Sequence, residues 1–403
     1  MSYQVDIDAN LLSGLLSGQD GLAKLLESVL NQVLEAQATE TLGADRHERN
    51  EDRQGYRNGY RARTLFTRVG QVTLQVPQTR DGSFSTEIFK RYQRSEQAFV
   101  LALMEMVVNG VSTRKVSAIT EELCGASFSK STVSQLTAQL EPRVRAFNER
   151  KFTKNYPFII VDALYIKTRE DDRVVSKAVL TVSGINEAGY REILGLKIAD
   201  SESGGTWDDF FIWLKGRGLK GVMFVISDAH AGLRTAAQRQ FRGASWQRCQ
   251  VHLMRNLMSK SSVRQKTEVI EFARRIFAAS DMIEARRRLS EFVQRFEKTA
   301  PKVVDCMEEG FDDAMAVMCL PEKYRKRLRT TNMQERLNEE IRRRERVIRI
   351  FPNEASAHRL IGALLAEKNE AWQENIYFGM SEFDEWRQAL PVKENNVFRL
   401  ADQ

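Results

Sequence analysis

Asp162 and Asp228 occupy positions in which a carboxylate points to chemistry rather than to packing. Asp162 interrupts the apolar run 158–166, where an ionised carboxylate is costly unless it is paired or binds a metal. Asp228 ends the apolar run 221–228, at the carboxyl edge where the sites of α/β sheets gather. On neighbouring strands the two anions would meet and require a cation between them. A single aspartate at the end of a strand usually caps a helix or pairs with an arginine. Two aspartates on central strands favour a bound cation instead.

A helix predicted from about Asn332 to Arg349 offers the third oxygen ligand. Its acids include Glu335, Glu339 and Glu340, and Glu335 lies off the apolar stripe of the helix. Carboxylates together with water and phosphate oxygens are the ligands that Mg²⁺ prefers.

The same region is strongly basic. Residues 323–349 hold eleven Lys or Arg against four acids. A cationic surface around an acidic metal site suits a polyanion, because arginines hold phosphates while the metal acts on one of them. Glu335, Glu339, Arg342 and Arg346 share one helical face, so the two arginines are expected to reach phosphates near the metal. The alternative is that Glu339 pairs with Arg342 or Arg343 on a solvated surface.

Cys249 and His252 form a Cys-x-x-His motif of uncertain role. Two zinc ligands at this spacing are half a site, and no second pair lies close in the sequence. A structural role near the active site, or a DNA contact, is favoured over zinc. The four widely spaced cysteines cannot form a disulfide framework, which indicates a reducing compartment.

The order of the predicted elements indicates the fold that positions these residues. Three strands in a meander are followed by helix, strand, helix and strand, which builds a mixed five-stranded sheet with helices packed on it. This is the order of the RNase H-like fold. The stretch from 251 to about 326 reads as helices and is too long for a loop, so we expect an all-helical insertion. The predicted strands are 158–166, 174–185, 190–199, 221–228 and 245–249.

The N-terminal part is expected to bind DNA. Residues 9–42 have helical apolar spacing, and this face packs either on the chain itself or on a second copy. The segment 53–94 has nine Lys or Arg, two acids and interleaved aromatics, a pattern suited to a phosphate backbone, although a solvated basic surface is the alternative. Within this segment, residues 69–77 alternate between apolar and polar, which predicts a short strand or hairpin. The candidate contacts are Arg57, Arg61 and Arg63.

A helix-turn-helix pattern follows in residues 99–140. One helix ends near Gly125, and a second is capped by Ser129. That second helix would present Lys130, Ser131 and Thr132 to a major groove. Helix pairs with a glycine turn are also common in proteins that never bind DNA.

Composition excludes several classes of protein. The 403 residues are 42% hydrophobic and 29% charged, as in ordinary globular proteins. No apolar run approaches the roughly 18 residues that cross a bilayer, which excludes a membrane protein. The N-terminus lacks the features of a secretory signal, so a cytoplasmic location is expected.

The chain is expected to divide into six segments. They are a helical segment 1–52 with a dimer contact as an alternative use, a basic aromatic segment 53–96, a helix-turn-helix-like domain 97–150, the first part of the core 151–250, a helical insertion 251–328, and a final part 329–403 that holds the core's last helix and C-terminal helices.

Several motifs together resemble the mutator-type transposases of bacterial insertion sequences. They are Asp162-Ala-Leu-Tyr, Ser227–Leu233, Trp246–Leu257 and Thr330–Arg344, with Gly55–Arg61 and Phe351–Asn353 in addition, so that the resemblance covers nearly the whole chain. Ala163 stands where the family pattern has glycine.

The resemblance implies an α/β core of RNase H-like type with a DDE triad on Asp162, Asp228 and Glu335. It also places the family's Cys-x-x-His signature on Cys249 and His252. It implies two Mg²⁺ ions, with Mn²⁺ as a substitute, held by the triad. The implied partners are the terminal inverted repeats and target DNA, bound by a homodimer. Phosphate contacts are expected from Arg336, Arg342, Arg343 and Arg346.

The leading prediction is therefore a DNA transposase that cuts transposon ends and joins the freed 3′-OH to target DNA. One alternative is a nuclease of the same fold that only hydrolyses DNA. Another is a helix-turn-helix regulator without catalysis, although a regulator has no use for an acid triad inside a basic surface.

Overall fold

The computed structural model describes residues 5–14, 21–48, 51, 53–67, 69–86, 88, 97–124 and 135–389. The chain divides into two units, Met1–Gln139 and Leu140–Gln403. Within the described ranges, no helix combines the length and apolar character needed to cross a bilayer.

The first unit begins with a helix packed on a hairpin. Helices α1 (Ala9–Gly14) and α2 (Gly21–Leu42) precede strands β1 (Arg57–Thr67) and β2 (Gly70–Thr79), which pair antiparallel. Leu34 of α2 packs with Leu65, Val72 and Leu74 of the hairpin, among other apolar residues. β1 extends into the Arg- and Tyr-rich segment, in which no alternation of apolar residues predicts a strand.

Two short helices complete the described part of this unit. Helices α3 (Gln97–Val108) and α4 (Thr113–Cys124) pack together through Phe99, Leu103 and Val116. Helix α4 covers part of the first helix predicted here, and the predicted stop near Gly125 lies outside the described residues. The proposed recognition helix, with Lys130, Ser131 and Thr132, lies outside the described residues.

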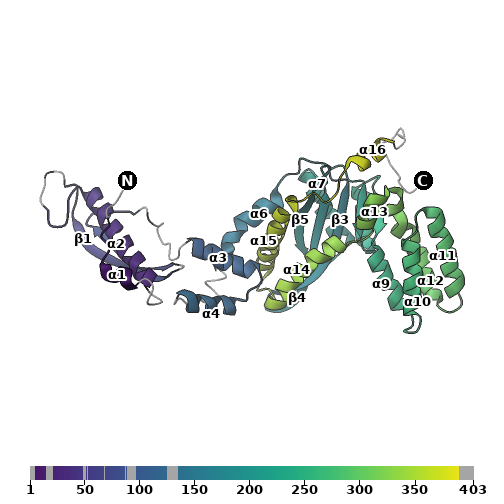
Figure 1. Cartoon of the computed structure of the whole chain (residues 1–403), viewed down its shortest axis with the longest axis horizontal. Helices are drawn as coiled ribbons and strands as arrows, with labels where there is room; N and C mark the ends of the chain where they lie inside the picture. Colours follow the sequence, from purple (N-terminus) through teal and green to yellow (C-terminus); the bar gives the residue numbers. More distant parts are fainter. Residues whose placement is uncertain are drawn as a thin grey trace. The chain divides into compact units, whose positions relative to one another are not determined.

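A mixed five-stranded sheet forms the centre of the second unit, as predicted (Figure 1). Its order is β5-β4-β3-β6-β7, in which β4 runs antiparallel to β3 and β5, while β6 and β7 run parallel to β3. The strands are β3 (Phe158–Glu170), β4 (Arg173–Ile185), β5 (Arg191–Ala199), β6 (Phe224–Ser227) and β7 (Ser245–Arg248).

Alternation along the strands gives the sheet two apolar faces. Ile159 and Val161 of β3 pack with Trp207, Phe211 and Leu233, which come from helices α7 (Gly204–Gly216) and α8 (Ala231–Gln240). The intervening residues face the opposite side, where helices α13 (Glu322–Leu328), α14 (Asn332–Ile348) and α16 (Ser381–Ala389) lie. The acids of the predicted triad belong to this second face.

Helices close the edge of the sheet at β5. Asn148 of α6 (Glu141–Glu149) donates to the Leu196 carbonyl at 3.0 Å and accepts from the Leu196 amide at 3.0 Å. Asn369 of α15 (Glu354–Gln373) accepts from the Ile193 amide at 2.8 Å. These amides satisfy the free hydrogen bonds that an edge strand otherwise presents to another chain. Helix α6, which the sequence analysis grouped with the helix-turn-helix segment, therefore packs within the second unit.

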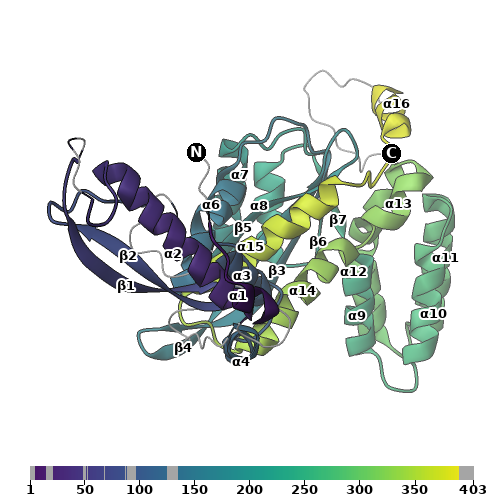
Figure 2. The ribbon, with the colours of Figure 1, turned by 60° about the vertical axis from the view of Figure 1, so that its left-hand side comes forward.

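The predicted all-helical insertion follows β7. It consists of α9 (Gln250–Lys260), α10 (Lys266–Phe277), α11 (Met282–Phe296) and α12 (Pro301–Met315), which share a separate apolar core (Figures 1 and 2). Gln247 of β7 ties the end of the insertion to the sheet, donating to the Ala314 carbonyl at 2.7 Å and accepting from the Val317 amide at 2.6 Å.

Candidate active site

The strand register brings Asp162 and Asp228 to the same level and face of the sheet. Ile160 of β3 pairs with Ile226 of β6, and each aspartate lies two residues beyond its isoleucine. One Asp162 oxygen accepts from the Ala163 amide at 3.0 Å, and the other accepts from Asn338 Nδ2 at 2.7 Å. Asp228 accepts from the His230 amide at 3.1 Å.

Asp162 lies in an environment that disfavours its negative charge. Burial raises the pKa of Asp162 to about 7, and the charge of Asp228 adds to this effect. Glu335 contributes in the same direction, while His252 opposes it. Two neighbouring carboxylates, one of them buried with a raised pKa, fit a site where a divalent cation supplies the missing positive charge.

Glu335 lies in the first turn of α14 and faces α9 of the insertion. Its Oε1 accepts from Arg255 Nη1 at 2.8 Å and lies 3.7 Å from His252 Nε2. As the side chains stand, no three His, Cys, Asp or Glu in the described ranges are arranged to hold a metal ion. The two aspartates thus fit a cation by charge and chemistry, whereas Glu335 is held by Arg255 and would have to leave it to join them.

A row of polar side chains fixes α14 across the sheet. Gln334 accepts from Ser183 Oγ at 2.7 Å and donates to Thr181 Oγ1. Asn338 holds Asp162, and Arg342 Nη1 donates to the Tyr165 carbonyl at 2.6 Å. The spacing of four places Gln334, Asn338 and Arg342 on one side of the helix. Gln334 and Asn338 were not among the predicted site residues, although their helical spacing next to Glu335 was a usable signal.

The Cys249–His252 motif joins the start of α9 to the start of α14. The buried Cys249 thiol accepts from both the amide and the hydroxyl of Thr331, each at 3.3 Å. Burial alone raises the pKa of this thiol, but hydrogen bonds with His252 and Thr331 lower it overall. The interaction with Cys249 is in turn the largest cause that raises the pKa of His252. The motif therefore sets the position of His252 beside Glu335.

The arginines predicted on α14 have different surroundings. Arg336 and Arg346 are exposed, and Arg343 is exposed with Glu340 at 3.8 Å. Arg342 is held by the Tyr165 carbonyl and by Glu345 at 2.6 Å, so its first role is to attach α14 to β3.

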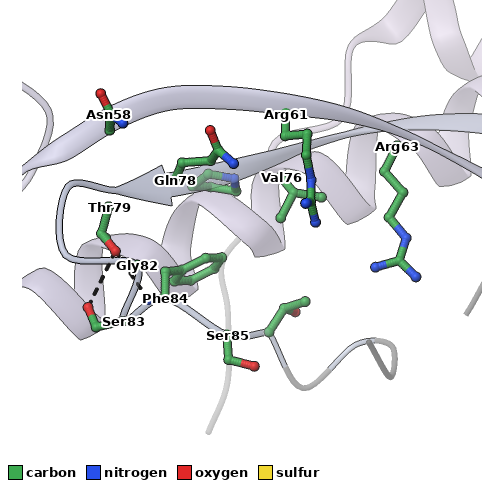
Figure 3. Close-up of a pocket in the computed structure, with 12 residues that line it drawn as sticks. Asn58, Arg61, Arg63, Val76, Gln78, Thr79, Gly82, Ser83, Phe84 and Ser85 are labelled. Carbon is green, nitrogen blue, oxygen red and sulfur yellow. Dashed lines mark hydrogen bonds between the residues drawn. The ribbon is translucent and has the colours of Figure 1, made fainter. Parts of the chain in front are cut away.

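The predicted arginines of the hairpin also differ from one another. Arg57 forms an ion pair with Glu35 at 3.0 Å and donates to Thr39 Oγ1 at 2.7 Å, which ties β1 to α2. Arg61 and Arg63 line a pocket of the hairpin, and Figure 3 shows both projecting to the side on which Phe84 and Ser85 lie. This cavity is polar and basic, as a phosphate contact requires. Asn58, Gln78, Thr79 and Ser83 also line it.

Comparison with known proteins gives a consistent result. The family model described as "Transposase, Mutator family" matches residues 5–375. The chain is 46% identical over 372 residues to the transposase for insertion sequence element ISRM5 of Rhizobium meliloti, covering 92% of this chain and 94% of the relative. It is 46% identical over 360 residues to the transposase for IS256 in transposon Tn4001 of Staphylococcus aureus, covering 88% and 92%. Identity to the transposase for IS406 of Burkholderia multivorans is 39% over 369 residues, covering 91% and 95%.

Proposed function

The chain belongs to the Mutator family of transposases, as its motifs predicted, and from this premise we propose that it binds the terminal inverted repeats of an insertion sequence and catalyses Mg²⁺-dependent strand cleavage and strand transfer. The observation that carries the proposal is the pairing of Asp162 and Asp228 on adjacent strands beside a basic helix that holds Glu335. Such a site acts on the phosphodiester backbone of double-stranded DNA in the cytoplasm.

We infer that the catalytic core is RNase H-like. The supporting observation is the strand order β5-β4-β3-β6-β7, with three antiparallel strands followed by two parallel ones and helices on both faces. The proposed first and second acids come from β3 and from the end of β6, which are central neighbours in this order.

In this proposal, Asp162, Asp228 and Glu335 hold two Mg²⁺ ions, or Mn²⁺ in their place. When bound, these ions would lower the pKa of the attacking hydroxyl and would stabilise the negative charge on the attacking and leaving oxygens. Cleavage exchanges a phosphodiester P–O bond for a bond to water, and joining exchanges a target P–O bond for a bond to the freed 3′-OH. Asn338 keeps the Asp162 carboxylate turned toward the site. Arg255 holds Glu335 in the metal-free protein and is free to contact phosphate when Glu335 leaves it.

The partners follow from the reaction. Two ends of one element must be brought together before joining, so we propose that a homodimer assembles on the DNA. Exposed Arg336, Arg343 and Arg346 on α14 are proposed to contact phosphates of the DNA that lies over the catalytic unit, and Arg61 and Arg63 to contact the end DNA. Lys130, Ser131 and Thr132 retain their proposed role in the major groove.

The test is strand cleavage by the purified full chain on a duplex that carries the terminal inverted repeat, with Mg²⁺ and mapping of the cut strand. Asp162→Asn, Asp228→Asn and Glu335→Gln should each abolish cutting and joining while DNA binding persists. Glu339→Gln, an exposed acid on the same helix, is the matched control and should stay active. Wild-type cleavage by any triad variant contradicts the assignment. Cutting without joining by the unaltered protein would indicate the nuclease, and binding without cutting the regulator.

A further inference from the structure

Three arginines from three elements of the second unit converge around one tyrosine. Arg191 begins β5, and its Cζ lies 4.6 Å from the ring centroid of Tyr377 and 4.8 Å from that of Trp372. The Cζ of Arg327 in α13 lies 4.6 Å from the same Tyr377 ring. Arg336 in α14 is the third member, since its charge lies close enough to act on both Arg191 and Tyr377, and we name Arg191, Arg327 and Arg336 the arginine cluster. Arg191 is far in the sequence from the other two members, which lie on consecutive helices.

The backbone beneath the arginine cluster is tightly fixed. The amide of Tyr377 donates to the Gly189 carbonyl at 2.8 Å, and Arg327 Nη1 donates to the Tyr377 carbonyl. Gly189 has a φ of +83°, and a Cβ added there would lie 1.9 Å from the Phe378 carbonyl oxygen. Only glycine permits this approach of the two segments. The backbone around Tyr377 is therefore fixed, so the position of the arginine cluster does not depend on side-chain rotamers alone.

The arginine cluster has no acidic counterpart. In the part of the chain that the structure describes, none of its three guanidinium groups has an ion-pair partner, and the buried Arg191 Nε has no hydrogen bond. Arginines elsewhere in this unit, such as Arg239, Arg255 and Arg295, lie 2.6, 2.8 and 2.7 Å from an acid.

The three charges also act on one another. Burial lowers the pKa of Arg191, and the neighbouring charges of Arg327 and Arg336 lower it further. The rings of Tyr377 and Trp372 contact the guanidinium groups of Arg191 and Arg327 but supply no carboxylate to balance their charge.

We propose that the arginine cluster is a binding site for a backbone phosphate of double-stranded DNA, distinct from the site of the three acids. Arginine suits this ligand because its planar fork donates two hydrogen bonds to one phosphate. Arg327 and Arg336 are exposed, so a phosphate reaches them from solvent. This inference rests on the proposed function, since it assigns part of the DNA path over the catalytic unit.

Glu335 and Arg336 are consecutive on α14 and project about 100° apart. The cluster thus lies on a different flank of the helix from the acids. A DNA segment that lies over the exposed side of α14 contacts both flanks, so the cluster fixes DNA that flanks the cut rather than the reacting phosphate.

The test compares DNA binding by the full chain and by the double variant Arg327→Gln/Arg336→Gln. Glutamine retains a donor for the Tyr377 carbonyl while it removes the charge. Fluorescence anisotropy with a labelled inverted-repeat duplex is measured in EDTA over a range of salt concentrations. Loss of two phosphate contacts should flatten the slope of log K against log salt by about 2. Inverted-repeat and random duplexes should lose affinity alike, because phosphates carry no sequence.

The matched control is Arg286→Gln/Arg295→Gln, which removes the same charge from two arginines that pair with acids in the same unit. Its slope should stay close to that of the unaltered chain. Arg327→Lys/Arg336→Lys, which restores the charge, should recover most of the slope. Circular dichroism and thermal melting confirm that each variant is folded.

Equal slopes in the two glutamine variants would overturn the phosphate site and assign the cluster to packing. If the unaltered chain binds no DNA, the proposed function fails together with this inference. If it binds DNA and the cluster variant keeps the full slope, the inference alone fails.

Discussion

Asp162 is a buried carboxyl whose charge state differs between the folded and the unfolded chain. Its folded pKa of about 7 lies above the ordinary aspartate value, so folding favours the protonated form. The Asp162 carboxyl therefore makes its full contribution to the free energy of unfolding below the unfolded pKa near 4. This contribution is lost as the pH rises through about 7. A bound cation would remove the cost of burying the ionised carboxylate, because it favours the ionised form.

We accordingly predict that Asp162→Asn stabilises the protein in EDTA. The gain in the free energy of unfolding should be larger at pH 8 than at pH 5. It should reach at most about 4 kcal/mol, which corresponds to a change of roughly 3 in the pKa of Asp162. Urea unfolding at the two pH values measures it. Asp208→Asn is the control, since Asp208 accepts from Arg239 Nη1 at 2.6 Å and should lose stability when this ion pair is weakened. A gain that does not depend on pH would show that Asp162 is ionised throughout.

Asn338 is expected to act through Asp162. Its Nδ2 holds one carboxylate oxygen at 2.7 Å, while its Oδ1 is buried with no hydrogen bond among the described residues. Removing a group that orients a metal ligand typically costs 10–100-fold in metal affinity or activity. Asn338→Ala should therefore raise the Mg²⁺ concentration needed for half-maximal cleavage by about that factor and leave DNA affinity unchanged.

The control for this substitution is Asn256→Ala, an exposed residue of α9 near Arg255. Titration of Mg²⁺ in the cleavage assay provides the measurement, and Mn²⁺ binding followed by electron paramagnetic resonance provides a readout independent of activity. Unaltered metal dependence in Asn338→Ala would show that this hydrogen bond only supports packing.

At the scale of elements, the buried sheet was predictable and the contacts between distant elements were not. The runs 158–166 and 174–185 are apolar enough to be recognised as strands, and they formed β3 and β4. Part of β1 was not predicted as a strand, because its exposed Arg, Tyr and Thr side chains do not alternate with apolar ones. The motifs predicted a triad of three acids, but the contact of Glu335 with Arg255 spans 80 residues. Such a contact depends on how the insertion packs, which local sequence does not encode.

The end of α14 stores strain. Arg349 has a φ of 65° and a ψ of −52°, and the Ile350 amide donates to the Ile348 carbonyl at 2.8 Å, which makes Arg349 the centre of a tight γ-turn. The next residue, Phe351, is buried and bridges to Thr168 of β3, so the turn pins α14 to the sheet. A residue held in such a sparsely populated backbone region costs of the order of 1–3 kcal/mol.

Arg349→Gly should relieve this strain and stabilise the protein by about 1 kcal/mol, after the greater entropy of glycine in the unfolded chain is subtracted. Arg349→Ala removes the same charge but retains the Cβ, so it should give no such gain. The difference between the two variants in chemical denaturation isolates the backbone effect. A glycine variant no more stable than the alanine variant would contradict a strained turn.

At the scale of the whole molecule, the division after Gln139 separates the hairpin pocket from the acids. DNA recognition and chemistry should therefore be separable by substitution in the full chain. Arg61 lines the pocket of the first unit and is exposed, whereas Lys24 is exposed on α2 of the same unit and outside the pocket. Both substitutions, Arg61→Gln and Lys24→Gln, remove one positive charge.

Arg61→Gln should weaken binding to the inverted repeat and reduce the salt slope by about 1, the effect of one lost phosphate contact. Lys24→Gln should leave both unchanged. At saturating DNA, Arg61→Gln should cleave at the wild-type rate with the wild-type Mg²⁺ requirement, because the acids and α14 belong to the other unit. Anisotropy titrations and single-turnover cleavage measure the two properties separately. An Arg61→Gln protein that binds normally would assign the pocket arginines to surface solvation, and one with an altered Mg²⁺ requirement would show that the two units are coupled in catalysis.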